Sequence, residues 1–294
     1  MKKFLFIASL IAGFFILHSC VDPNSLVNTN SITGPRILSR VDSSGVTQQK
    51  YHLTNSKLTG ATTFTYDASS PNPTVGTISL IYSGNKISVF EYLSAPPAVN
   101  GQNFQYKNVI KLMYDTSGKV TNTILEEYIT TPTTGTVPGR RLVGTLTYNS
   151  SGKVIKQFQK IGTPAGGIFN YSMYSEDNIT YTGENISGVE TFWGTLDSAG
   201  NPSGTPGMFS KMTAENFDTK INPYTTLPKE FNICWGVIQG FGFIYLNPNN
   251  HSKLTYTNYV SGASATTVQN FQYQYDAQNY PTSSNNQDFI YQAL

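Results

Sequence analysis

Apolar and polar side chains alternate with a period of two along most of this chain. One run places Ile78, Leu80 and Tyr82 on one face, and residues 110–114 and 271–275 alternate in the same way. Successive side chains of a β-strand point to opposite faces, so each run has one apolar face and one polar face. The pattern predicts antiparallel strands that pack one face on a core and leave the other in water.

The alternating runs recur at a regular interval. Each ends in an aromatic residue that precedes a turn, and these residues are Tyr82, Tyr114, Tyr148, Tyr181, Phe217 and Tyr275. The first four are 32, 34 and 33 residues apart, and Phe217 follows after 36. Such a period indicates a repeated structural unit. The unit predicted here is a strand, a tight turn and a second strand that begins with Lys or Asn and a β-branched residue.

Four stretches have the form Asp or Asn, two residues and Gly: Asp42–Gly45, Asp115–Gly118, Asn149–Gly152 and Asp197–Gly200. The second resembles the Asp-Thr-Gly loop of aspartic proteases, but Ser117 replaces that glycine and another copy has Asn149 for the acid. Asp or Asn at the first turn position accepts a backbone hydrogen bond, and Gly at the fourth adopts positive φ. The stretches are therefore predicted to be turns with no catalytic role.

Pro and Gly are concentrated between the units, at residues 94–103, 130–139 and 162–167. These segments are predicted to be long loops at the end of the sheet opposite the tight turns. We expect roughly a dozen strands of about 6 to 8 residues, enough for an open twisted sheet to curl. The fold class is all-β: an antiparallel meander of repeated hairpins that forms a curved open sheet, half-barrel or barrel over residues 36–294, as a single domain.

An outer-membrane β-barrel also has short turns at one end and long loops at the other. Its strands need about 9 to 11 residues and an outward apolar band. The strands expected here are shorter and neither face is apolar throughout, so this alternative is disfavoured.

The N-terminus has the features of an export signal. Lys2 and Lys3 precede an apolar run over residues 4–17, which is shorter than the roughly 20 residues of a membrane span. The run ends Leu-His-Ser-Cys, which resembles the lipobox of bacterial lipoproteins. We expect residues 1–19 to be a lipoprotein signal peptide and Cys20 to be the lipid attachment site; a plain signal peptide with a chance Cys is the alternative.

This anchor determines the expected location. Acyl chains on Cys20 would hold the protein on the membrane without a spanning segment. Residues 20–35 are expected to form a flexible tether. We therefore expect a lipid-anchored protein of the cell envelope, on the outer membrane, and leave open whether it faces the periplasm or the surface.

Charge and candidate ligands exclude several functions. Without residues 1–19 the chain keeps 17 basic and 17 acidic residues, and this neutral balance disfavours nucleic-acid binding. The remaining Cys234, His52 and His251 are far apart in sequence, which disfavours a zinc site or a Cys–His nucleophile. No metal or cofactor is expected.

Two pairs of neighbouring acids, Glu126-Glu127 and Glu176-Asp177, are the nearest candidates for glycoside hydrolysis. A glycosidase needs two carboxylates on opposite sides of one sugar. Neighbours in a strand point to opposite faces, so neither pair is such a dyad by itself. We expect no enzymatic activity.

Residues 231–246 depart from the alternation because they are almost all apolar and contain three glycines. The segment is predicted to be a buried helix or strand pair that plugs the concave side of the sheet. A functional alternative is that Trp235, Phe241, Phe243 and Tyr245 line a cleft for an apolar or sugar ligand, with Trp193 joining that wall.

Several motifs together resemble known bacterial proteins. The Tyr-Asp hairpins resemble the Tyr-Asp repeats of large secreted shell proteins. With the lipobox, the Asp218–Pro223 segment and the closing Asn279–Pro281, residues 36–291 resemble a family of Bacteroidota-type lipoproteins of unknown function with a porin-like β fold. Asn279 stands where Gly is usual there, and Phe217 where Tyr is usual. The resemblance implies the fold and the anchor, but no activity and no catalytic residues.

The expected function is that of a lipid-anchored envelope protein without catalysis. It would bind a glycan, an apolar ligand or an envelope protein through its loops or the concave face of the sheet. The alternatives are a structural or assembly component of an envelope complex that docks by sheet-edge pairing, and, less favoured, a glycan-degrading enzyme.

Overall fold

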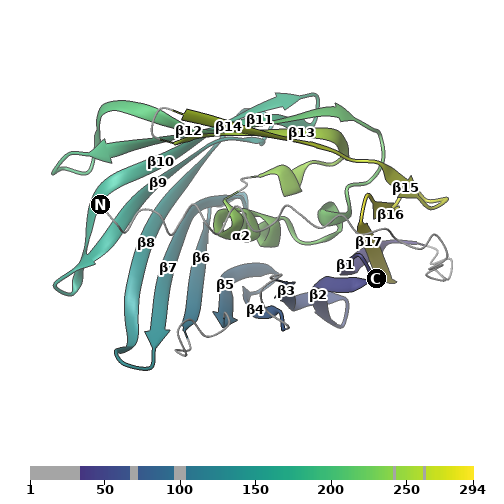
Figure 1. Ribbon diagram of the computed structural model, residues 1–294, viewed down its shortest axis with the longest axis horizontal. Coiled ribbons are helices and arrows are strands. Elements are labelled where there is room, and N and C mark those ends of the chain that lie inside the picture. The colour runs from purple at the N-terminus through teal and green to yellow at the C-terminus, as the bar shows by residue number, and fades with distance from the viewer. Residues whose placement is uncertain (1–33, 67–71, 96–103, 241–242, 261–262) are drawn as a thin grey trace.

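The computed structural model describes residues 34–66, 72–95, 104–240, 243–260 and 263–294. Seventeen antiparallel strands form one curled sheet that is not closed (Figure 1). The predicted all-β class and curved open sheet are confirmed, although the strands outnumber the expected dozen. The first strand begins at Arg36.

The ladders run from β15 through β16 and β17 to β1, and then along the chain from β1 to β14. The strands are β1 (Arg36–Ser43), β2 (Val46–Thr54), β3 (Lys57–Thr65), β4 (Thr74–Ser83), β5 (Lys86–Ala95), β6 (Gln105–Tyr114), β7 (Val120–Thr131), β8 (Gly135–Tyr148), β9 (Val154–Ala165), β10 (Ile168–Thr182), β11 (Asn185–Leu196), β12 (Pro202–Phe217), β13 (His251–Val260), β14 (Ala263–Asn270), β15 (Tyr273–Tyr275), β16 (Pro281–Ser284) and β17 (Gln287–Ala293).

Three of the four predicted Asp/Asn turns have the expected geometry. The Asp115 Oδ1 atom accepts a 2.9 Å hydrogen bond from the backbone N–H of Lys119, and Gly118 has φ 87°. Asn149 and Asp197 accept equivalent bonds, each at 2.9 Å. The side chain therefore satisfies a donor of the turn, and the protease resemblance has no structural counterpart.

The fourth stretch is a tighter turn than expected. Asp42 lies within β1, and only Ser44 and Gly45, with φ of 51° and 79°, connect β1 to β2. Two successive residues with positive φ make a two-residue hairpin turn. The Asp42 carboxylate does not cap the turn and forms an ion pair with Arg40 at 3.0 Å.

The predicted long loops are wrong at two of the three places. Most of residues 130–139 and 162–167 belongs to ladders, so β4 to β12 are 10 to 16 residues long. Gly166 and Gly167 form a two-residue turn with φ of 58° and 86°. Pro138 pairs with Tyr128 beside a bulge in β8, a place where a sheet tolerates proline. Residues 96–103, most of the remaining predicted loop, lie outside the described residues.

The repeated tyrosines link each hairpin to the preceding one. Each hydroxyl donates to a backbone carbonyl one hairpin back: Tyr82 to Leu58 (2.6 Å), Tyr114 to Ile87, Tyr148 to Val120 (2.7 Å) and Tyr181 to Val154 (2.8 Å). The lysine that precedes each acceptor lies over the same ring, with its nitrogen 3.6 to 5.4 Å from the centroid; these are Lys57, Lys86, Lys119 and Lys153. The Tyr and Lys positions of the repeat therefore have a structural role.

The connection between β12 and β13 crosses the concave side of the sheet (Figure 1). It contains η1 (Pro223–Thr226), α2 (Lys229–Gln239) and η2 (Ile244–Leu246). Glu230 lies in the first turn of α2, where the helix dipole favours an acid, and Gly240 ends the helix in the left-handed conformation. The helix confirms the predicted buried plug.

The plug packs on the apolar face of the sheet through aromatic rings. The Phe231 ring lies 5.8 Å from Tyr51 and 5.5 Å from Phe90, and the Trp235 ring lies 5.9 Å from Tyr92. Burying a side chain of this size contributes about 1.5–3 kcal/mol. The main core therefore forms between α2 and the inner face of the strands.

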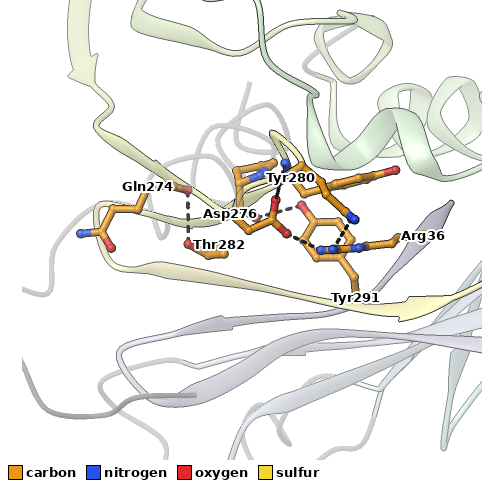
Figure 2. Close-up of polar contacts among 8 residues, drawn as sticks. Arg36, Gln274, Asp276, Tyr280, Thr282 and Tyr291 are labelled. Carbon is orange, nitrogen blue, oxygen red and sulfur yellow. Dashed lines mark hydrogen bonds and ion pairs between the residues drawn. The ribbon is translucent and has the colours of Figure 1, made fainter. Parts of the chain in front are cut away.

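Arg36 in the first strand holds the turn between β15 and β16 (Figure 2). Its guanidinium donates to the carboxylate of Asp276 and to the side chain of Gln278, and it lies 4.9 Å from the centre of the Tyr280 ring. The Tyr291 hydroxyl donates to the Pro281 carbonyl at 3.0 Å. These contacts join the beginning and end of the described chain.

The two segments that carry the resemblance lie against each other. The Asp218 carboxylate accepts hydrogen bonds from the Tyr275 hydroxyl and, at 3.1 Å, from the backbone of Asn250. The Ile221 N–H donates to the Asn279 carbonyl at 3.2 Å. Asn279 has φ 68°, a left-handed conformation that Gly favours and Asn tolerates. The substitution of Asn for the usual Gly is therefore compatible with the turn.

Candidate functional site

The inner face of the sheet changes from apolar to polar along β10 to β13. Near the tight turns, Ile179, Val189 and Met212 are cross-strand partners and belong to the core beneath the plug. Two residues further along each strand, on the same face, the cross-strand partners are polar. We call this set the inner polar row; its members, in order across five strands, are Gln157, Asp177, Thr191, Ser210 and Asn258.

A second row adjoins the inner polar row on the side away from the core. Gln159 pairs with Ser175, and Ser175 pairs with Trp193. The Ser175 hydroxyl donates to the Gln159 side chain at 3.3 Å. The Trp193 ring stacks on Phe209 with a centroid distance of 4.5 Å and an interplanar angle of 13°. Both rings are half-buried, so an aromatic surface borders the polar groups.

Several polar atoms of these rows have no protein partner. Gln157 and Gln159 are 3% and 8% exposed, yet their Nε2 atoms form no hydrogen bond within the described residues, and neither does Asn258 Oδ1. A buried polar atom without a partner costs about 1–3 kcal/mol. Apolar side chains would avoid this cost, and the three amide atoms keep free hydrogen-bonding capacity on the inner face.

Asp177 is the acidic member of the inner polar row. Its carboxylate accepts a 2.7 Å hydrogen bond from Thr191 and has no ion-pair partner among the described residues. Burial raises the pKa of Asp177 to about 6, with a smaller increase from Glu176, and the Thr191 hydrogen bond opposes this shift. Near neutral pH the carboxylate is mostly ionised, and a partner with a donor would stabilise it.

The neighbouring acid Glu176 has a different environment. It pairs with Lys156 at 2.7 Å, whereas Asp177 bonds to Thr191. Glu126 pairs with Lys111 at 3.1 Å, and Glu127 pairs with Arg140 at 2.7 Å. Both acidic pairs thus separate their members, as the strand geometry predicts.

The structure separates the aromatic residues that were proposed to line one cleft. Trp235 and Phe243 are 6% and 2% exposed in the core, and Tyr245 packs against Tyr224 with ring centres 4.9 Å apart. Trp193 lies apart from them, beside the inner polar row. The fifth, Phe241, lies outside the described residues. A cleft common to the five is therefore not formed by the four described.

Sequence reasoning did not identify Gln157, Gln159 or Asp177 as site residues. The cause is a register shift where β8 meets β9: Tyr148 pairs with Val154, but Thr147 pairs with Lys156. The extra residue reverses the alternation, so Val154 and Gln157 both face inward although they are three residues apart. In the sequence, the two glutamines lie two residues apart, as residues on one face of a strand do. This spacing indicates that they face inward only once the position of the bulge is known.

A second concave feature lies at the tight-turn end, between α2 and the β10–β11 turn. It is a depression of about 340 Å³ whose lining includes Lys153, Glu184 and Lys229. The Lys153 nitrogen already donates to the Gly183 carbonyl at 2.7 Å and pairs with Glu184 at 2.9 Å. Its charge is satisfied within the protein, so we favour the inner polar row as the site.

No cluster of three His, Cys, Asp or Glu side chains suited to a metal occurs among the described residues. His52 bonds to Thr62 at 2.8 Å, and burial lowers the pKa of His251 to about 4. Cys234 is buried, which raises the pKa of its thiol far above the usual value. Within the described chain, no helix has both the length and the apolar content of a membrane span.

Comparisons with known proteins add no assignment. No family model matches the chain, and no curated protein matches it significantly. The resemblance to Bacteroidota-type lipoproteins stays a prediction. The predicted signal peptide and Cys20 lie outside the described residues, and so does most of the predicted tether.

Proposed function

We propose that the protein is a lipid-anchored cell-envelope protein that binds a polar ligand on its concave face, without catalysis. The observation that supports the binding site is the set of buried, unpaired amide atoms of Gln157, Gln159 and Asn258 beside the half-buried ring of Trp193. Folding alone gives no reason to keep these groups, because an apolar inner face would be more stable. A ligand that forms hydrogen bonds with these groups explains why they are kept.

Thermal unfolding of the detergent-solubilised full chain tests the binding site. A library of polar small molecules is screened for compounds that raise the melting temperature, since a ligand that binds the folded state stabilises it. We expect Gln157→Leu and Gln159→Leu to abolish the shift and Gln274→Leu to retain it. Gln274 is an exposed residue of β15, so it is a matched control. A shift that survives both inner substitutions contradicts this site.

The anchor is tested separately by metabolic labelling with a fatty acid. Cys20→Ala is expected to abolish lipid incorporation and retention in the membrane fraction, and Cys234→Ala is expected to change neither. Cys234 is a suitable control because it is buried in the folded domain. Labelling that persists in Cys20→Ala would remove the proposed anchor.

A second candidate, an assembly component, is supported by the edge strand β14. Its eight residues are uncharged, contain no Pro and pair with β13, and no ladder is formed on its other side within the described residues. Charges and prolines are common devices that block pairing at sheet edges. Thr266→Pro is then expected to abolish co-purification with an envelope protein, a result that ligand binding in the inner polar row does not predict.

A further inference from the structure

The chemistry of the inner polar row also restricts the class of ligand, an inference that rests on the proposed function. We infer that the inner polar row, together with Gln159 and Trp193, is a binding site for a neutral saccharide. The unpaired groups, the aromatic surface and the spacing of the side chains each lead to this class.

The polar groups of the site include both donors and acceptors. Gln157 Nε2 and Gln159 Nε2 are unpaired donors and Asn258 Oδ1 is an unpaired acceptor. The Asp177 carboxylate already accepts from Thr191 and can accept further hydrogen bonds. An ammonium group donates only and leaves both amides unsatisfied. A carboxylate or phosphate accepts only and is repelled by Asp177. A hydroxyl donates and accepts, so the hydroxyls of a saccharide match both kinds of group. Gln157 and Asn258 lie four strands apart, about 19 Å along the sheet, so one sugar ring can reach Gln157, Gln159 and Asp177, and only an oligosaccharide reaches Asn258 as well.

The aromatic surface supplies the apolar part of the site. Trp193 lies in the row next to Asp177, and its ring is held in place by the parallel stack on Phe209. Aromatic rings offer a large, rigid apolar surface at low entropic cost. The C–H face of a pyranose can pack on this surface while its hydroxyls reach the inner polar row.

The strand geometry fits a single sugar ring or a short oligosaccharide. Gln159, Asp177 and Trp193 lie on the adjacent strands β9, β10 and β11. Strands are about 4.8 Å apart and a two-residue step is about 6.8 Å, so the three Cα atoms lie within about 10 Å of one another. Their side chains can therefore contact the same ligand.

The site holds a saccharide without hydrolysing it. A glycosidase needs a second carboxylate opposite the first. Of the acids adjacent to the site in sequence, Glu176 is paired with Lys156, and Glu190 with Lys211. Asp177 is the sole acid of the two rows, and it acts as a hydrogen-bond acceptor.

Tryptophan fluorescence provides a direct measurement. The chain has two tryptophans, so Trp235→Phe leaves Trp193 as the only one, and excitation selective for tryptophan then reports on Trp193. The full chain in detergent is titrated with glucose, galactose, mannose and N-acetylglucosamine and with their β-linked oligosaccharides. We expect a saturable change in Trp193 emission with at least one of them. Calorimetry on the chain that retains both tryptophans confirms the affinity.

Matched substitutions assign the signal to the site. Asp177→Asn and Trp193→Leu are expected to weaken saccharide binding at least tenfold. Glu176→Gln and Phe192→Leu change the adjacent residues in the same strands and are expected to leave it within twofold. Circular dichroism and unfolding curves identify any variant that fails to fold; Asn is isosteric with Asp, so Asp177→Asn remains informative if the Trp193 variant is lost.

The outcomes separate the two proposals. Saccharide binding that depends on Asp177 and Trp193 supports both. If amines or peptides bind with the same dependence and saccharides do not, the saccharide inference is wrong and the binding function stands. If saccharides bind equally to wild type and Asp177→Asn, this site is wrong. If no screened molecule responds to substitution of Gln157, Gln159 or Asp177, the proposed binding function is contradicted as well.

Discussion

Asn247 holds the backbone of Ile186 with both atoms of its side-chain amide. Its Oδ1 atom accepts a hydrogen bond from the Ile186 N–H, and its Nδ2 atom donates to the Ile186 carbonyl at 3.1 Å. In the preceding hairpins, the equivalent carbonyl accepts from a tyrosine hydroxyl of the next unit. The next unit here has Phe217, which has no hydroxyl, so a residue of the plug replaces it.

Replacing Asn247 should therefore be costly. Asn247 is fully buried, and Asn247→Ala leaves an N–H and a carbonyl of β11 without partners. We expect a loss of about 2–4 kcal/mol in the free energy of unfolding, measured by chemical denaturation. Asn201→Ala, at an exposed position, should change it by less than about 0.5 kcal/mol. Equal effects would show that the bond to Ile186 contributes nothing.

The tyrosine links should each contribute a smaller amount. Tyr148→Phe removes only the hydroxyl that donates to Val120 at 2.7 Å. We expect a loss of about 1 kcal/mol in the free energy of unfolding, the usual net contribution of one hydrogen bond. Tyr66→Phe, at a residue that is 41% exposed, is the control and should be neutral. An unchanged denaturation midpoint for Tyr148→Phe would contradict the structural role given to the repeat.

The contact between Arg36 and Asp276 should stabilise the ends of the chain. Arg36 is 8% exposed, so Asp276→Ala leaves a buried cation without its carboxylate partner. Removing one partner of a buried ion pair costs about 3–5 kcal/mol. Gln278 and Tyr280 still contact Arg36, so we expect Asp276→Ala to lower the free energy of unfolding by about 3 kcal/mol or less. Hydrogen exchange in β15, β16 and β17 should accelerate.

Asp115→Ala provides the control for this contact. Asp115 caps a turn of the same form but is fully solvent-exposed and has no arginine partner. Asp115→Ala should lower the free energy of unfolding by clearly less than Asp276→Ala does. It should leave hydrogen exchange in β15, β16 and β17 unchanged. Equal losses would mean that the capping bond, and not Arg36, accounts for the effect.

Stability should depend on pH through Asp177. Its pKa is raised from 3.8 to about 6 in the folded state, so the folded protein binds the proton more tightly than the unfolded chain. The ionised carboxylate therefore destabilises the fold above pH 6, and this cost disappears as the pH falls from 6 to 4. Asp177→Asn should raise the free energy of unfolding at pH 7 by about 1–3 kcal/mol, with little effect at pH 4.

His251 acts in the opposite direction and must be separated from this effect. Burial lowers its pKa to about 4, so the unfolded chain takes up the proton first and stability falls as the pH drops from 6.5 to 4. The difference between wild type and Asp177→Asn at each pH cancels this contribution. A constant difference from pH 7 to pH 4 would contradict the shifted pKa of Asp177.

The regular features of the fold were predictable because they depend on local chemistry. The alternation that ends at Tyr82 or Tyr114 forms a strand in any sheet with one wet face, and Asp115 with Gly118 makes a turn through bonds within five residues. The long hairpins were missed for the reverse reason. Polar segments rich in Pro and Gly extend as strands only because a neighbouring strand supplies the ladder.

The candidate site was predictable only in part. Trp193 was predicted only as part of a cleft wall with Trp235 and Phe243, and those two residues fill the core. Gln157 and Asp177 carry no sequence signal of their own. They meet because a bulge changes the phase of β9 and because cross-strand register pairs residues 20 positions apart.

The sequence by itself determined the all-β class, the period of the hairpins and the positions of their turns, because strand alternation and turn chemistry act between near neighbours. Only the tertiary structure decided how many strands the sheet has, that Asn247 replaces a missing tyrosine hydroxyl, and that unpaired amides gather beside Trp193. These features depend on register and on the packing of the plug, and both join residues that are distant in the chain.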